Sequence, residues 1–203
     1  SEAMAGAQRF ISNKDEVISN IRHNAIFEEL ENTGSLSIRT DKAKERHFKK
    51  DFILKRIKAE KIGNQIVRLR QEGNLILYAG HKRSKSGVSV GIREVSQQGS
   101  QEVLNLGKEV TDLQAGIIAI QLGIQRMREG DPTRELLSII THDPEPIQAL
   151  QAFDIKSKAV LECLRDVTAL AESQIKITLI LVQGEGKNRW EGWKPHFTSG
   201  VAG

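Results

Sequence analysis

Cysteine, aromatic residues and long apolar runs are all scarce in this chain of 203 residues. Its one cysteine, Cys163, excludes a disulfide within the chain, which fits a reducing compartment. Aromatic residues make up 4% of the sequence, so Leu, Ile, Val and Ala must build the core. A membrane-spanning helix needs about 20 apolar residues, and no apolar run in this sequence approaches that length. No secretory signal pattern is present. We therefore expect a cytoplasmic or nuclear protein that is not secreted and has no membrane span.

The sequence also has little that indicates catalysis. Its five histidines show no metal-ligand spacing, and there is no Ser-His-Asp elbow, phosphate-cradling glycine loop or kinase motif. His142-Asp143-Pro144-Glu145 holds groups that bind metals or transfer protons, but an acidic turn bounded by proline needs no such role. We predict that the protein is not an enzyme and uses no metal and no cofactor.

Positive charge is the main feature that the sequence does have. The net charge is +4, but residues 39–93 hold sixteen Lys and Arg against five Asp and Glu, and the segments on both sides are acidic. A helical pattern covers about 41–72 and ends at Gly73-Asn74. Few acids interrupt the basic array on this helix, which a basic loop at 81–87 continues.

Arrays of Lys and Arg bind phosphate backbones because each contact releases a condensed counterion. We expect sequence-independent binding of a nucleic acid, with RNA favoured over DNA, because base-stacking aromatic residues are scarce. The alternatives are a solvated helix face, or contact with an acidic protein or an anionic membrane surface. The predicted phosphate contacts are Lys42, Lys44, Arg46, Lys49, Lys50, Lys55, Arg56, Lys58, Lys61, Arg68, Arg70, Lys82, Arg83 and Lys85.

A second pattern, an apolar heptad, follows the basic segment. Spacings of three and four residues alternate without a miss through Val103, Leu106, Val110, Leu113, Ile117, Ile120, Ile124 and Met127. Such a seam predicts a coiled-coil helix that assembles a dimer or a tetramer. The alternative is a partner helix in the same chain, for example the helix expected over about 147–172.

Residues outside the seam indicate that this helix is buried on two sides. Ile118 and Leu122 add apolar surface that a bare zipper would leave in water. Gly116 and Gly123 weaken the helix but let a neighbour approach closely.

The other elements complete a mainly helical fold. We expect helices over about 13–31 and 133–140, and a strand where Ile175, Ile177, Leu179 and Leu181 alternate. The predicted fold class is mainly α, a helical bundle with a heptad oligomerisation helix and one or two short strands.

Four segments make up the predicted organisation. Residues 1–38 form an N-terminal helical segment, 39–98 the basic helix and loop, 99–183 the oligomerisation core, and 184–203 a glycine-rich tail. Trp190, Trp193 and Phe197 in the tail either bind a protein partner or fold back onto the bundle.

The predicted function is an oligomeric nucleic-acid-binding protein, an architecture typical of virus-encoded and chromatin-type binders. The alternative is an oligomeric scaffold or adaptor that binds an acidic protein through the basic helix and the tail.

Overall fold

A computed structural model of the chain describes residues 41, 45–46, 50–95 and 100–184. Strands and helices alternate along these residues, which form a mixed α/β fold. The bounds are β1 Glu45–Arg46, β2 Ile53–Lys58, the 3-10 turn η1 Ala59–Lys61, α4 Ile62–Gln71, β3 Leu75–Ser84, β4 Gly87–Glu94, β5 Gln101–Gly107, α5 Asp112–Glu129, β6 Leu136–Thr141, α6 Pro144–Gln151, β7 Asp154–Ile155, α7 Lys158–Glu172 and β8 Lys176–Gln183.

Six of the described strands form one sheet in the order β2-β8-β6-β3-β4-β5. β3, β4 and β5 are antiparallel neighbours, whereas β2, β8, β6 and β3 run parallel to one another. Parallel neighbours require crossover connections, and α4, α5, α6 and α7 lie in these connections. β1 and β7 pair separately as a short antiparallel ladder.

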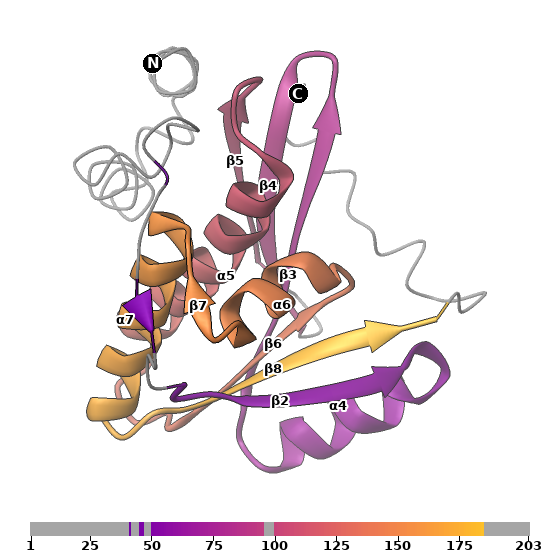
Figure 1. The fold of residues 1–203 in the computed structure, drawn as a ribbon. Helices are drawn as coiled ribbons and strands as arrows, with labels where there is room; N and C mark the ends of the chain where they lie inside the picture. Colours follow the sequence, from indigo (N-terminus) through magenta and orange to yellow (C-terminus); the bar gives the residue numbers. More distant parts are fainter. Residues whose placement is uncertain (1–40, 42–44, 47–49, 96–99, 185–203) are drawn as a thin grey trace.

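Apolar side chains cover both faces of this sheet. On one face α5, α6 and α7 pack over a large core that includes Leu77, Leu104 and Ile139. On the other face α4 packs over a smaller core that includes Tyr78 and Ile180. Figure 1 shows α4 beside β2, apart from the other three helices. The sheet is therefore the middle layer of the structure.

The predicted fold class, a mainly helical bundle, is wrong because the heptad pattern runs through a strand and a helix. Val103 and Leu106 lie in β5, Val110 lies in the following connection, and only Leu113 to Met127 lie in α5. In β5 the buried residues alternate with half-buried ones, which is the period of a strand and not of a helix. No continuous coiled-coil seam exists over 103–127.

Helix α5 is instead buried inside its own chain. Every residue from Gln114 to Ile124 is buried, as is Met127. The helix contacts β3 and β4 on one side and α7 on the other. The single helix expected over about 147–172 is wrong, because that region is divided into α6, β7 and α7. Helix α7 does contact α5, as the alternative of a partner helix in the same chain predicted.

Other local predictions had mixed outcomes. The expected helix over 41–72 is wrong because its region forms β2, η1 and α4, although α4 does end before Gly73. The apolar run in 136–140 forms the buried strand β6 instead of a helix. The expected loop at 81–87 belongs to the β3–β4 hairpin. The strand expected over 175–181 is confirmed as β8.

The sheet joins two segments that the sequence suggested as separate units. Strands β2, β3 and β4 come from residues 39–98, and β5, β6 and β8 come from residues 99–183. The expected helix over 13–31 lies outside the described residues, as do positions 1–38 and 185–203.

An upstream carboxylate caps the start of α7. The Ser157 side chain accepts a hydrogen bond from the Val160 backbone N–H at 3.3 Å. Asp41 accepts from the Ala159 backbone N–H at 2.9 Å and from the Ser157 hydroxyl at 2.8 Å. These acceptors satisfy N–H groups that the first turn of a helix leaves unpaired, and a negative charge suits that end of the helix.

We predict opposite effects of one substitution at two helical glycines. A Cβ at Gly116 of α5 would lie 2.4 Å from Pro146 Cγ, so Gly116→Ala should lower the free energy of unfolding by about 1–3 kcal/mol. In α4, no atom lies near the position of a Cβ on Gly63, so Gly63→Ala should raise the free energy of unfolding by about 0.5–1 kcal/mol. Urea denaturation measures both values. A Gly116→Ala protein as stable as the wild type would contradict the α5–α6 contact.

We also predict that Cys163 is unreactive in the folded protein. Its side chain is buried in α7, and burial, with a smaller contribution from Asp166, raises the pKa of its thiol. Reaction needs the thiolate, so an aromatic disulfide reagent should label the native chain orders of magnitude more slowly than the urea-unfolded chain. Labelling at the unfolded rate in native buffer would contradict the burial.

Candidate functional site at the ends of β3 and β6

The candidate site lies where the connections of the sheet diverge. β3 continues into β4 on one side, whereas β6 continues through α6 and α7 to β8 on the other. In open α/β sheets, the carboxyl ends of parallel strands at such a switch point are the usual place for ligands. Residues from β3, the start of α5 and the start of α6 meet here.

His81 is the central side chain of the site. It lies on β3 with 14% of its side chain exposed. Its Nε2 is 3.7 Å from Asp112 Oδ1, and its Nδ1 is 3.6 Å from Asp143 Oδ2. These distances suit ion pairing of a protonated imidazole and are too long for hydrogen bonds. We call His81, Arg83, Asp112 and Asp143 the His81 cluster.

Arg83 ties the hairpin to the start of α5. Its Nε donates to Asp112 Oδ1 at 3.2 Å. Its two terminal nitrogens donate to the backbone carbonyls of Val110, at 2.7 Å, and Lys108, at 3.3 Å. A guanidinium has five N–H donors in a rigid fork, and neighbours within the fold engage all three of its nitrogens. Arg83 therefore has a structural role, although its side chain is 45% exposed.

Asp143 links the cluster to α6. Its Oδ1 accepts from the Glu145 backbone N–H at 3.0 Å, which caps α6, and its own N–H donates to Thr141 Oγ1 at 3.1 Å. Above it α5 and α6 are in close contact, because the position of a Cβ on Gly116 is occupied by the Pro146 ring. The starts of α5 and α6 therefore lie close to each other beside the cluster.

This geometry limits the chemistry of the cluster. A histidine acts as a general acid or base when one ring nitrogen is within hydrogen-bond reach of the reacting group. Both ring nitrogens of His81 face carboxylates, and Asp112 and Arg83 bind each other. The cluster links β3 to the starts of α5 and α6.

His142 lies on the opposite side of the sheet from Asp143. Its ring stacks on Tyr78, with 6.3 Å between the ring centroids and 13° between the planes. Tyr78 belongs to the core beneath α4, and burial raises the pKa of its hydroxyl. The stacked pair contributes to the packing of this face, and His142 does not join His81.

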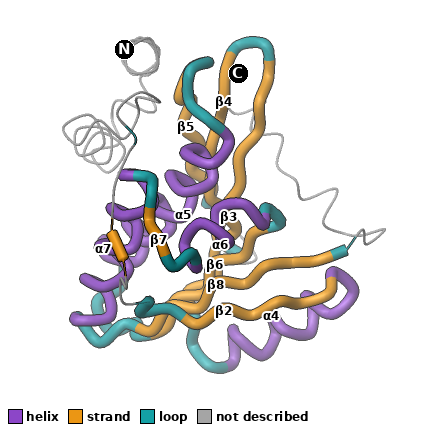
Figure 2. Tube along the Cα trace, in the orientation of Figure 1, coloured by secondary structure: helices purple, strands orange, loops and turns teal. Residues whose placement is uncertain are grey.

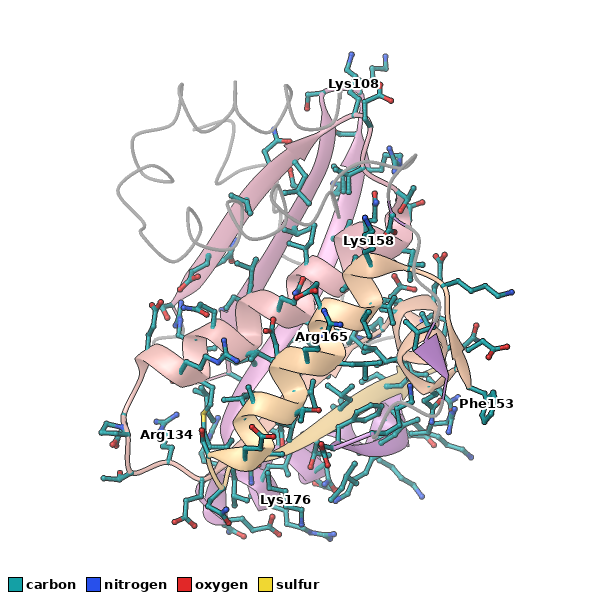
Figure 3. The ribbon with its side chains drawn as sticks, turned by 60° about the vertical axis from the view of Figure 1, so that its left-hand side comes forward. Lys108, Arg134, Phe153, Lys158, Arg165 and Lys176 are labelled. Atoms are coloured by element: carbon teal, nitrogen blue, oxygen red, sulfur yellow. The ribbon has the colours of Figure 1, made fainter. Side chains whose placement is uncertain are left out.

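Three exposed lysines lie at the end of the molecule where the β3–β4 hairpin turns. Lys82 and Lys85 lie on the β3–β4 hairpin, and Lys108 follows β5. Figure 2 shows the hairpin turn and the β5–α5 connection at the same end of the molecule, and Figure 3 labels Lys108 there. We call Lys82, Lys85 and Lys108 the basic tip.

Two glycines and Arg83 bring these loops together. Val88 pairs with both Arg83 and Gly107, so the three strands stay paired as far as the tip, with a register shift between Val88 and Ser89. A Cβ on Gly87 would lie 2.6 Å from the Gly107 carbonyl carbon, which shows how closely the backbones approach. The bond from Arg83 to the Lys108 carbonyl then fixes the connection against the hairpin.

The predicted phosphate contacts do not share one surface. Lys55, Arg56 and Lys58 lie on β2, Lys61 in η1, and Arg68 and Arg70 on α4, whereas Lys82, Arg83 and Lys85 lie on the hairpin at another part of the molecule. Lys50 is half-buried before β2. Arg46 is described only as part of β1, and the remaining three, Lys42, Lys44 and Lys49, lie outside the described residues, as do the tail residues Trp190, Trp193 and Phe197.

The predicted function is therefore wrong in the form in which the sequence suggested it. An oligomeric nucleic-acid binder with a Lys/Arg-rich helix requires a helix over 41–72, and that region holds a strand, a turn and the short helix α4. The alternative scaffold requires the same helix and a coiled-coil bundle, and α5 packs within its own chain.

The His81 cluster could not be found by spacing. His81, Asp112 and Asp143 are each separated by 31 residues, and only the sheet topology brings them together. The one signal available was the pair His142-Asp143 after an apolar run, which marks the end of β6. In the described part of the chain, no three or more His, Cys, Asp or Glu side chains are arranged to hold a metal ion.

Comparisons with known proteins give a likeness to solved structures alone. RNase H1 from the halophilic archaeon Halobacterium salinarum NRC-1 matches with 14% identity and a TM-score of 0.44, over 55% of this chain and 87% of that one. An N-terminal RNase H domain from Mycobacterium tuberculosis, solved as a fusion with maltose-binding protein, matches with 12% identity and a TM-score of 0.42, over 55% and 88%. At these values the likeness carries no argument about activity. No protein-family profile and no curated protein matches the chain.

None of the described helices is long and apolar enough to cross a membrane.

We predict that Arg83 stabilises the fold. Arg83→Met removes two bonds to backbone carbonyls and the pair with Asp112, so the free energy of unfolding should fall by about 1 kcal/mol, at the low end of the usual range because the side chain is partly exposed. The matched control is Arg68→Met on the exposed face of α4, which should change the free energy of unfolding by less than about 0.5 kcal/mol. Equal losses in urea denaturation would contradict the role of Arg83.

Proposed function

We propose that this chain is a non-catalytic domain that contacts the phosphate backbone of a nucleic acid through the basic tip. The observation that carries the proposal is that Lys82 and Lys85, on the β3–β4 hairpin, and Lys108, in the connection after β5, lie at one end of the fold. Each is exposed, and lysine binds phosphate as a point charge without reading bases. The backbone is common to RNA and DNA, so the proposal covers both.

The surroundings of the tip support this role. Positive charge remains available for a ligand only where acidic neighbours are engaged elsewhere. Asp112, the acid that begins α5, pairs with Arg83 and faces His81. The tip is held by backbone pairing and by the Arg83 bonds, so its lysines are placed before a ligand arrives.

The His81 cluster supports the absence of catalysis. Each of its ring nitrogens faces a carboxylate, and Pro146 fills the space against Gly116. In this proposal the cluster sets the shape of the tip and takes no part in a reaction.

The proposal differs from the helix-based function that the structure overturned. It uses neither a basic helix nor an oligomer, and Arg83 changes from a phosphate contact to a positioning residue. Lys108, which the sequence did not suggest, becomes a contact. Three cations predict weak binding that depends strongly on salt.

Salt-titrated binding tests the tip. For a fluorescein-labelled DNA duplex of 20 base pairs, three phosphate contacts predict a slope of about −2.7 for log K against log salt, since each contributes about −0.9. Each single change Lys82→Gln, Lys85→Gln or Lys108→Gln should make the slope less steep by about 0.9. The triple variant should lose nearly all binding while its melting temperature stays unchanged.

The matched control replaces three exposed lysines elsewhere. Lys55, Lys58 and Lys61 lie on β2 and η1, and changing all three to Gln removes the same net charge from the protein. We expect this control to keep the slope of the wild type. Equal losses in both triple variants, or no loss at the tip, would exclude the basic tip as the contact surface.

A cleavage assay tests the proposal that the domain is non-catalytic. Labelled RNA, DNA and RNA–DNA hybrid, incubated with the protein and with magnesium or manganese, should be cut no faster than in buffer. Cleavage that disappears in a His81→Ala variant of unchanged fold would show that the His81 cluster is catalytic and would overturn the proposal.

A further inference from the structure

A groove lies at the other end of the sheet, where no function has been assigned above. It has a volume of about 410 Å³ and lies between the start of β2 and the turn from α7 into β8. Figure 3 labels Lys176, one of its lining residues, at the end of the molecule opposite Lys108. Small-molecule sites commonly have volumes of about 300–1,000 Å³.

The lining of the groove combines apolar side chains with two cations. Phe52, Ile53, Ala171, Ile175 and Ile177 supply the apolar part. Lys50 and Lys176 supply two positive charges against the one carboxylate of Asp51. Apolar walls with a few charged groups are typical of sites that bind amphiphilic molecules.

Lys50 is the unusual group in this lining. Its Nζ is buried and has no hydrogen-bond partner among the residues that the structure describes. Burial lowers the pKa of its amine, because the ammonium loses water and gains no acceptor. A buried donor without a partner destabilises the fold unless a ligand supplies the acceptor.

Gln174 lines the groove in a strained backbone conformation. Its φ is 65°, the left-handed region that glycine normally occupies after a helix. The N–H of Ile175 bonds to the Leu170 carbonyl at 3.0 Å, and the N–H of Gln174 bonds to the Ala171 carbonyl at 3.0 Å, which is the usual helix-ending motif. Gln174 is one of the residues that line the groove, and backbone strain of this kind is common at ligand sites.

We propose that this groove binds a small organic anion with an apolar body, whose carboxylate or sulfonate head group pairs with Lys50 after this side chain turns its buried amine toward the groove. The apolar body lies along Phe52, Ile175 and Ile177, and the amide of Gln174 is within the lining that meets the head group. The inference is independent of the proposed contact at the basic tip, which lies at the opposite end of the fold.

Fluorescence titration with 8-anilinonaphthalene-1-sulfonate tests the site on the full chain. The dye should bind the wild type at one site, and decanoate should displace it, whereas decanol, which lacks the charge, should displace it at least about tenfold less well. Lys50→Met keeps the length of the side chain and should weaken dye binding by about tenfold or more, with an unchanged or higher melting temperature. The control Lys55→Met, an exposed lysine on β2, should leave binding unchanged.

A second variant separates binding from stability. Gln174→Gly relieves the left-handed strain, so it should raise the melting temperature, and it should also weaken dye binding because the amide is lost. A wild type that binds neither dye nor decanoate would overturn the proposal. Equal displacement by decanol and decanoate, or equal binding by Lys50→Met and the wild type, would overturn it as well.

Discussion

Helix α5 is enclosed by its own chain along its middle, and the candidate site depends on that enclosure. The sheet covers one side of the helix and α7 covers the other, where Gln121 donates to Asp166 at 3.2 Å. A helix buried all round cannot rotate or slide without opening a cavity. Its first residue, Asp112, is therefore held beside His81, and the loop before it is held against the β3–β4 hairpin.

The topology of the fold, and not position along the sequence, decides where the charged residues lie on the molecule. One basic segment of sequence is divided between the sheet edge and the hairpin. On β2, one of the two edge strands of the six-stranded sheet, Lys55, Arg56 and Lys58 occupy a position where lysine and arginine discourage pairing with another chain. The same residue type thus protects an edge at one end of the fold and, in our proposal, meets phosphate at the other.

Secondary structure was predicted best where only one periodicity fitted the apolar residues. Lys176 and Thr178 interrupt the apolar residues of this segment in the sequence, so Ile177, Leu179 and Leu181 indicated a strand. They form β8 as expected, although both faces of the strand are buried. The apolar run of β6 is buried on both faces, and such a run looks alike in a strand and in a helix. In β5, Val103 and Leu106 satisfied a heptad by coincidence, although the buried residues of the strand are Glu102, Leu104 and Leu106. The His81 cluster was not predictable because it joins residues that only the parallel crossovers bring together.

The capping of α7 by Asp41 has a practical consequence for dividing this chain. The six-stranded sheet begins at β2, and residue 50 would look like a natural place to start a shorter protein. Such a protein would leave the N–H of Ala159 and the hydroxyl of Ser157 without their carboxylate acceptor. The boundary of the folding unit therefore lies upstream of its first sheet strand, at or before Asp41.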